Sequence, residues 1–387
     1  MNKITELTSR KPKHVIIADT VREQIFSGAL ERGSRLISDS DFARKYKINE
    51  RTVAAGLNTL VREGLLERIP GRGTFVKEKS ASKTVAFIGY YINQDCGEII
   101  NGIEETLSKN GYLLTVKCSG GNFQTEKKIV EELADEISGL IVYPLIIKNK
   151  HNAAVFKNLQ KKHFPFVLVD RYYENFECDY SGVDNYSGSY DVTESLIRKG
   201  HRRIAHIVAP SQSSVVRERL EGYLGALKDH KIPFDADLVR QLPFREDFNH
   251  SYMKEISSIV NKLLQLKSPP TAITSTADGL SVLAMKVLLA KGIKIPQNMA
   301  LAGFDNGSLG LFAEIPLTTV GVDFFQIGKS AAELLLCRLR NKDFSPVKKI
   351  IQPVSLIERQ SSNPDFYKNG SYMLEMMNKK LNMMNFA

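Results

Sequence analysis

The chain has 387 residues, of which 43% are hydrophobic and 25% charged, a composition typical of a soluble protein with two or three domains. No apolar run approaches the ~20 residues that a membrane-spanning helix needs, and the N-terminus, MNKITELTSRKPKH, lacks the apolar core of a signal peptide. We therefore expect a cytoplasmic protein without a membrane partner, whose four scattered cysteines stay reduced and form no metal site.

The net charge of +10 is concentrated near the N-terminus. Residues 1–83 contain 17 Lys and Arg against 10 Asp and Glu, whereas the rest of the chain contains 36 against 33. This imbalance favours a polyanionic partner for the N-terminal part. A solvated basic surface would have the same composition, so charge alone does not decide between the two.

The first 78 residues predict a basic arm followed by a small helical domain. Residues 1–13 form the arm, and residues 15–27 have the apolar spacing of a helix that Gly28 ends. Ser38 is expected to cap a second helix, with Asp41 three residues later in the pattern of a capping box.

Residues 46–76 contain the most informative pattern of the chain. Asn49 is placed to cap a third helix that Gly64 ends, and its apolar residues fall on one face, which leaves Glu50 and Arg51 facing outward. Two short strands around a Pro-Gly-Arg-Gly turn follow. A helix of this kind next to a basic hairpin indicates a winged helix-turn-helix that reads DNA. A winged helix that binds protein is the alternative.

Beyond a polar linker at 79–83, apolar strands alternate with amphipathic helices. The strands are expected at 85–91, 112–118, 139–144, 164–170, 202–209, 271–276 and 299–305. The helices are expected near 97–109, 124–137, 152–162, 187–199, 215–230, 251–266, 279–291 and 325–340. This alternation predicts an α/β fold with doubly wound parallel sheets in two lobes, and ligands beyond the carboxyl ends of the strands. Residues 361–387 are expected to form a flexible tail.

Residues 14–78 resemble the GntR-type winged helix. The resemblance rests on the turn Gly33-Ser34-Arg35-Leu36, on Leu60-Val61-Arg62-Glu63-Gly64-Leu65 and on Gly71-Arg72-Gly73-Thr74-Phe75-Val76. It implies the following DNA-binding candidates: Ser38, Arg44, Lys47, Asn49, Arg51, Thr52, Arg72, Gly73 and Thr74. Three positions where the family usually has arginine hold Ser40, Glu50 and Ala54. We therefore expect Arg51, Lys47 and Arg44 to take over part of the DNA contact.

Residues 84–360 resemble the effector domain of LacI/GalR-type repressors, which is similar to periplasmic binding proteins. The matching phrases include FPFVLVDR (164–171), IRKGHRRIAHI (197–207), RLEGYLGAL (219–227) and GFDN (303–306). The resemblance implies two lobes, the second mainly at 185–303. Together with the GntR-like head, the arrangement resembles chimeric transcription regulators of the arabinose-repressor type.

That resemblance places polar contacts to a small sugar in the cleft between the lobes. The effector-binding candidates are Tyr90, Asp95, Arg171, Arg219, Asp278, Asp305 and Phe324. Arg219 is expected to follow a strand and open a helix, and Asp278 and Asp305 to follow strands at the cleft edge. Each has a structural alternative: helix capping for the two aspartates, a surface ion pair for Arg219, and a core position for Phe324.

These features predict a repressor of carbohydrate-utilisation genes that binds operator DNA as a homodimer under the control of a sugar. A sugar-acting enzyme with Asp305 and Asp278 as acid and base is the alternative, and a transport binding protein is a third possibility. His201, in KGHRR, is expected at a strand entrance in a packing role. No phosphate loop, metal-ligand spacing or nucleophile elbow stands out, so neither a cofactor, a metal nor catalytic residues are expected.

Overall fold

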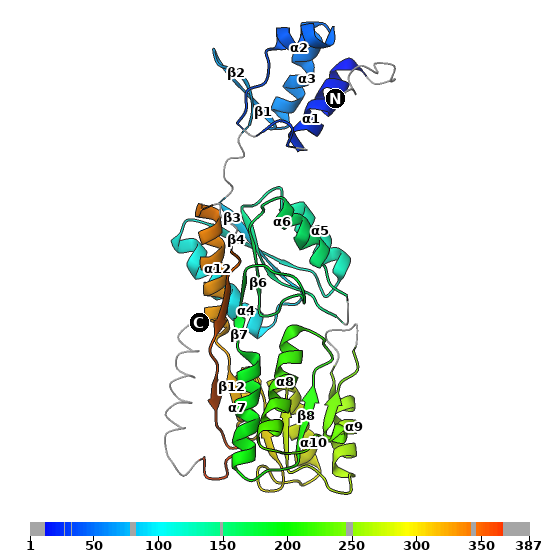
Figure 1. Cartoon of the computed structure of the whole chain (residues 1–387), viewed down its shortest axis with the longest axis vertical. Helices are drawn as coiled ribbons and strands as arrows, with labels where there is room; N and C mark the ends of the chain where they lie inside the picture. Colours follow the sequence, from blue (N-terminus) through cyan, green and yellow to red (C-terminus); the bar gives the residue numbers. More distant parts are fainter. Residues whose placement is uncertain are drawn as a thin grey trace. The chain divides into compact units, whose positions relative to one another are not determined.

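The computed structural model describes residues 12–366, apart from 27, 32, 78–82, 148–149, 245–250 and 342–345. The chain divides into two units, Met1–Ser82 and Lys83–Ala387. Figure 1 shows the first unit in blue and the second in the remaining colours of the bar. The expected arm at 1–13 and linker at 79–83 lie almost entirely outside the described residues.

The N-terminal unit is a three-helix domain with a two-stranded wing. Helices α1 (Lys13–Phe26), α2 (Asp39–Tyr46) and α3 (Glu50–Arg62) precede the antiparallel strands β1 (Leu66–Ile69) and β2 (Gly73–Val76). Val53, Leu57 and Leu60 of α3 have no exposed surface and pack against Ile17 and Val21 of α1. The apolar face predicted for the third helix therefore forms the centre of this core.

The two predicted caps are present. The Ser38 hydroxyl oxygen accepts the backbone N–H of Asp41 at 3.1 Å, and the side-chain oxygen of Asn49 accepts that of Arg51 at 2.8 Å. These bonds satisfy backbone donors that a helix start leaves without a partner. Lys47 ends α2 in a left-handed conformation with φ 51°, which turns the chain sharply into α3.

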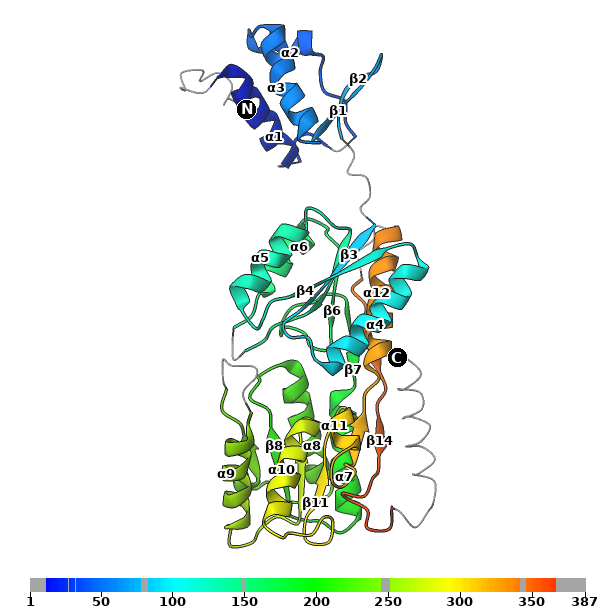
Figure 2. The same ribbon diagram turned by 180° about the vertical axis from the view of Figure 1, so that it is seen from behind.

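Lobe one of the second unit is built on a six-stranded parallel sheet in the order β13-β7-β6-β5-β3-β4. Its strands are β3 (Thr84–Gly89), β4 (Leu113–Cys118), β5 (Gly139–Tyr143), β6 (Phe166–Val169), β7 (Tyr180–Val183) and β13 (Lys349–Gln352). Helices α4 (Gln94–Lys109) and α12 (Phe324–Asn341) cover one face, and α5 (Phe123–Leu133) and α6 (Ala153–Lys161) cover the other (Figure 2). Burial on both faces explains the continuous apolar runs of these strands.

Lobe two is a four-stranded parallel sheet in the order β11-β10-β8-β9. Its strands are β8 (Ile204–Val208), β9 (Val239–Gln241), β10 (Ala272–Ser275) and β11 (Ala300–Ala302). Helices α7 (Asn185–Arg198) and α8 (Ser214–Asp229) pack on one face, and α9 (Met253–Leu264) and α10 (Asp278–Ala290) pack on the other. The doubly wound α/β architecture predicted from the sequence is confirmed.

The chain passes between the lobes three times. After β7 it enters α7, after β12 (Thr319–Gly321) it returns to lobe one in α12, and after β13 it goes back into β14 (Ser355–Ile357), which pairs with β12. The sequence pattern did not predict β7, β9, β12, β13 or β14, which have three or four residues each. Two short helical segments, η1 (Ala236–Leu238) and α11 (Ser308–Leu311), were not predicted either.

The expectation of a flexible tail from residue 361 is wrong for its first residues. Ser361 and Ser362 are buried, and their hydroxyls lie within hydrogen-bond distance of Leu301 O and Thr318 Oγ1, at 2.6 and 2.7 Å. The rest of the expected tail, from 367, lies outside the described residues. Within the part of the chain that the structure describes, no helix combines the length and the apolar character needed to cross a membrane.

Candidate functional site

The start of α3 presents the charged residues predicted to meet DNA. Glu50 and Arg51 are exposed in its first turn, and Arg44 and Lys47 are exposed just before it, at the end of α2 and in the turn. Arg44 makes a loose pair with Asp41 at 3.4 Å. Three cations and one carboxylate therefore surround the helix end that enters the major groove in helix-turn-helix proteins.

Two of the DNA-binding candidates act as helix caps. The side-chain oxygens of Ser38 and Asn49 accept backbone N–H groups of the helices that follow them, and the Ser38 hydroxyl also donates to the Asp41 carboxylate at 2.6 Å. Thr52, the next candidate along α3, is half-buried. Ser38 thus fixes the start of α2 and Asn49 that of α3, which leaves Arg51 as the exposed cation of the first turn of α3.

The wing turns on two glycines and carries Arg72 at its tip. Gly71 and Gly73 have φ values of 74° and 111°, which only glycine adopts readily. Arg72 is exposed, and its guanidinium carbon lies 6.0 Å from the centre of the Phe75 ring. The wing thus holds a cation at the point where winged-helix hairpins approach the duplex.

One wing candidate is largely buried and one residue was missed. Thr74 is 7% exposed, and it lines a pocket beside the wing together with Arg35 and Arg68. Arg35 is exposed and lies against the wing, because a Cβ atom built on Gly73 would come within 2.9 Å of Arg35 Nε. The GSRL turn that contains Arg35 was recognised for its glycine rather than for its cation.

Arg219 and Asp305 form a buried ion pair in lobe two. Arg219 Nη1 lies 2.7 Å from Asp305 Oδ1 and donates to Thr276 O at 2.7 Å, while Nε donates to Asn185 Oδ1 at 2.8 Å. The guanidinium also stacks over the Phe304 ring at 3.7 Å. Arg219 comes from the second turn of α8, so the expectation that it opens the helix is wrong by five residues.

Burial perturbs Asp305 strongly. It raises the pKa of Asp305 to about 8, with the positive charge of Arg219 acting in the opposite direction. Asp305 also has a φ of 113°, which is unusual for a residue with a side chain and indicates a constrained backbone. A constrained, desolvated carboxylate beside a guanidinium has the character of a functional site.

Asp278 is held differently, although it lies at the predicted cleft edge. Its two carboxylate oxygens accept the backbone N–H of Gly307 at 2.9 Å and the Thr319 hydroxyl at 2.6 Å. Burial raises the pKa of Asp278 to about 7. Because both oxygens accept hydrogen bonds from residues of the same lobe, Asp278 has the environment of a structural residue.

Lobe one contributes an arginine between two tyrosine rings. The Arg171 guanidinium carbon lies 4.9 Å from the Tyr90 ring centre and 4.7 Å from that of Tyr143, and Arg171 Nη2 donates to the Tyr143 hydroxyl at 3.1 Å. Asp170, which ends the FPFVLVD run, lies 3.3 Å from Arg171 Nε. Tyr143 and Asp170 were not among the candidates, although each follows or ends an apolar strand.

Asp95 connects the two lobes electrostatically. It lies in the first turn of α4, and burial together with the negative charge of Asp170 raises its pKa. The positive charge of Arg219 lowers the pKa of Asp95, and the negative charge of Asp95 in turn raises the pKa of Asp305. Asp95 of lobe one, which interacts with Asp170, is therefore within electrostatic reach of the Arg219–Asp305 pair of lobe two.

Two remaining sequence candidates lie in packed surroundings. Phe324 is 8% exposed and packs into the core of lobe one, at the first residue of α12. His201 precedes β8, as expected, and its Nδ1 lies 2.9 Å from the Thr271 hydroxyl. Burial and Lys199 lower its pKa. A packing role accounts for both residues.

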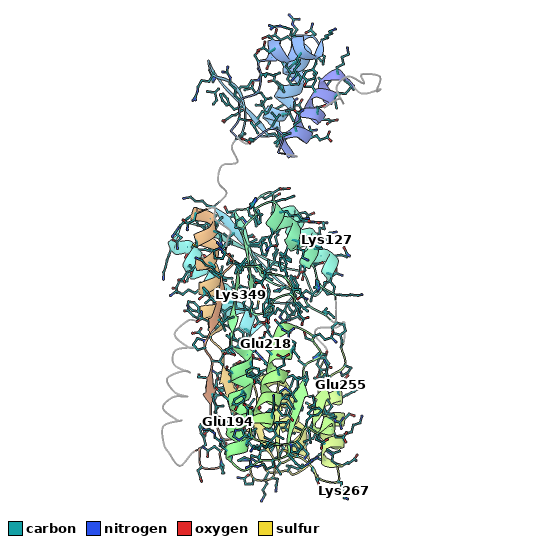
Figure 3. All side chains as sticks on the ribbon, viewed as in Figure 1. Lys127, Glu194, Glu218, Glu255, Lys267 and Lys349 are labelled. Atoms are coloured by element: carbon teal, nitrogen blue, oxygen red, sulfur yellow. The ribbon has the colours of Figure 1, made fainter. Side chains whose placement is uncertain are left out.

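Direct bonds join the lobes beside this charged group. Tyr172 and Glu174, in the loop after β6, bind Glu218 and Arg217 of α8, respectively, and the Tyr172 backbone N–H donates to the Ser214 hydroxyl at 3.1 Å. Figure 3 labels Glu218 on α8. We refer to these three contacts as the interlobe bridge. The lobes are therefore in direct contact on this side.

Comparison with known proteins matches each unit to a described family. Residues 15–76 match the bacterial regulatory proteins of the gntR family, and residues 193–362 match the periplasmic binding protein-like domain. The chain is 28% identical to the arabinose metabolism transcriptional repressor of Geobacillus stearothermophilus, over 91% of this chain and 98% of that protein.

Solved structures agree with this assignment. A LacI transcriptional regulator from Bacillus cereus subsp. cytotoxis NVH 391-98 is 29% identical, with a TM-score of 0.63 over 72% of this chain and 98% of that chain. The transcriptional regulator CelR in complex with cellobiose is 25% identical, with a TM-score of 0.62 over 81% of this chain and 91% of that chain. The chain therefore joins a GntR-type winged-helix DNA-binding head to a LacI/GalR-type, periplasmic-binding-protein-like body, in the arrangement of the arabinose metabolism repressors.

Proposed function

We propose that this protein is a cytoplasmic transcription repressor that binds operator DNA through its head and a neutral sugar between the lobes of its body. The observation that carries the proposal is the group Asp95, Asp170, Arg219 and Asp305, in which buried and half-buried charges come from both lobes of a chain that also has a winged helix. Sugar hydroxyls both donate and accept hydrogen bonds, so a neutral sugar can bind carboxylate and guanidinium groups without bringing a further charge into the site.

The relatives support a sugar as the effector class. One is named for arabinose metabolism and another was solved with cellobiose. Tyr90, which is half-buried beside the buried Tyr143 on the lobe-one side, offers an aromatic ring for the C–H surface of a sugar. The Arg171 guanidinium that lies between them supplies donors for hydroxyl oxygens.

Hinge closure would transmit sugar binding to the head. Because the chain crosses between the lobes at three places, a change in the angle between the lobes requires a coordinated change in three strand-to-helix or strand-to-strand connections. The coupling is expected to be ~1–3 kcal/mol and reciprocal, so that DNA changes sugar affinity by the same factor as sugar changes DNA affinity.

A homodimer is part of the proposal. Leu113 and Val116, on the edge strand β4, are 70% and 38% exposed, and Leu309 and Phe312, around α11, are 67% and 52% exposed. A bond between Ser308 and Gln94 at 2.6 Å connects α11 to the start of α4. Exposed apolar side chains of this kind are typical of an interface between copies of a chain. Sedimentation should give a dimer that Leu113→Asp combined with Leu309→Asp converts to a monomer.

Binding of the promoter next to the gene for this protein tests the proposal. Fluorescence anisotropy of the labelled fragment should show saturable binding at fixed salt, and a sugar panel should contain at least one compound that changes the dissociation constant 5- to 150-fold. Asp305→Asn should abolish the response to sugar and retain DNA binding. Binding no tighter than to a scrambled fragment, with every sugar tested, would contradict the proposal.

The same sample distinguishes a repressor from a sugar-acting enzyme. The sugar recovered from the protein after prolonged incubation should be unchanged by chromatography and mass spectrometry. Steady conversion that Asp305→Asn or Asp278→Asn abolishes would instead support the enzyme.

A further inference from the structure

A cavity between the lobes lies near the Arg219–Asp305 pair and is lined by other residues. This cavity has a volume of about 610 Å³. Lobe one lines it with Ile146, His151 and residues 172–175, and lobe two lines it with Val208, residues around the start of α8, Val239 and Gln241. We refer to it as the outer cavity. Its volume lies in the range of small-molecule sites.

The arginine that lines the outer cavity is already paired. Arg217 pairs with Glu174 and lies 3.9 Å from Glu218 and 3.7 Å from Glu221. A phosphorylated ligand would therefore meet an arginine that is already neutralised. A neutral ligand is favoured.

The remaining lining groups match the surface of a sugar ring. Tyr172, Tyr173 and His151 provide rings, and the ring centres of His151 and Tyr173 lie 5.2 Å apart. Gln212 and Gln241 provide amides that make no side-chain hydrogen bond within the described part of the chain. Flat apolar faces next to free amide donors and acceptors suit the C–H faces and hydroxyls of a carbohydrate.

A chain of side-chain hydrogen bonds connects the outer cavity to the charged group. Glu218 accepts the Tyr172 hydroxyl across the cleft and accepts Asn185 Nδ2 at 3.2 Å, and Asn185 Oδ1 accepts Arg219 Nε at 2.8 Å. The outer cavity and the Arg219–Asp305 pair are therefore neighbours along α8.

We propose that the effector is an oligosaccharide of at least two rings, with one ring at the Arg219–Asp305 pair and the next ring in the outer cavity. This inference rests on the proposed function and makes its sugar class specific. Because both lobes line the outer cavity, the second ring adds contacts that exist only when the lobes are closed. A disaccharide should therefore hold the closed form better than its own monosaccharide does.

Calorimetric titration of the full chain with matched sugars tests this inference. The probes are arabinose against α-1,5-arabinobiose and glucose against cellobiose. At least one disaccharide should bind ten-fold or more tightly than its own monosaccharide. Gln241→Ala and Gln212→Ala should weaken that disaccharide about five-fold or more and leave monosaccharide affinity unchanged. Gln265→Ala, at the exposed end of α9, is the matched control and should change neither.

Each contrary result has a distinct meaning. A monosaccharide that binds as tightly as its disaccharide, or glutamine variants that weaken both equally, would overturn the outer cavity as a ring site and leave the sugar-controlled repressor intact. Operator binding without affinity for any of the four sugars would overturn both the inference and the sugar part of the proposed function. Unfolding of a variant is excluded by comparing its thermal transition with that of Gln265→Ala.

Discussion

Individual side chains of one chemical type take different roles here because their surroundings differ. Asp278 and Asp305 both follow strands of lobe two, yet Asp278 binds Gly307 and Thr319 of its own lobe while Asp305 pairs with Arg219. The sequence shows the carboxylate and its place after a strand. It does not show whether a loop folds back to satisfy that carboxylate.

The exposed cation at the start of α3 leads to a prediction about DNA. Arg51→Ala should lower operator affinity by about 1–3 kcal/mol if Arg51 reads a base edge, or reduce the salt dependence by about one phosphate contact if it does not. Arg62→Ala removes the same charge from the last turn of the same helix and should have a smaller effect on operator affinity. Anisotropy titrations at several salt concentrations measure both. Equal losses for the two variants would show that Arg51 contributes only general charge.

The buried Glu126 leads to a prediction about pH. Burial raises the pKa of Glu126 to about 7, although the hydrogen bonds that the carboxylate accepts from Leu145 and Asn152 lower this pKa. The folded body then holds this proton more tightly than the unfolded chain does, so the free energy of unfolding should fall as the pH rises from about 4.5 to about 7. The contribution is on the order of 3 kcal/mol at most.

Urea unfolding at pH 5 and pH 8 checks this expectation. Glu126→Gln, which has no proton to lose, should show a smaller difference in stability between the two pH values than the natural chain. The same difference in both proteins would assign the pH dependence to other groups.

At the scale of elements, α4 and α12 pack so closely that glycine is required at two positions. A Cβ atom on Gly102 would come 2.1 Å from Phe325 O, and one on Gly328 would come 2.0 Å from Ile99 O. Helix α12 packs on lobe one although 140 residues, 184–323, separate its start from the end of β7 in the same lobe. Helix periodicity predicted both α4 and α12, but it did not predict that these two helices pack against each other.

This close approach leads to a prediction about two glycines of one helix. Gly102→Ala should destabilise the body by about 1–3 kcal/mol, because the backbone of α12 cannot move away without repacking the core. Gly97→Ala in the same helix meets nothing within 4 Å and should be neutral or stabilising by up to about 1 kcal/mol. Thermal unfolding compares them, and equal effects would mean that the two helices separate easily.

At the scale of the whole molecule, head and body have separate cores. The apolar cluster of the head contains only residues of the first unit, and the four clusters of the body contain only residues of the second. Each unit therefore has the buried surface that an independently folding domain needs. We therefore expect two unfolding transitions. Sugar should raise the transition temperature of the body only, and a mutation in the core of the head should lower that of the head only.

A cavity in the head core tests this independence. Leu57→Ala removes a fully buried side chain and should destabilise the head by about 2–5 kcal/mol. Calorimetry should show a lower transition for the head alone, and the sugar affinity of the body should be unchanged. A matching loss of sugar affinity would show that the two units do not fold separately.

The sequence by itself determined the parts of this protein whose signals are local. Helix caps at Ser38 and Asn49, the apolar faces of the helices and the buried strands of a parallel sheet all depend on residues within a few positions of one another. Only the tertiary structure decided which distant residues meet. Long-range packing determines three features: the addition of β13 to the sheet of lobe one, the exposure of Arg72 beside the buried Thr74, and the pairing of Arg219 with Asp305. No short window of sequence contains both partners of such contacts, so their geometry appears only when the chain is folded.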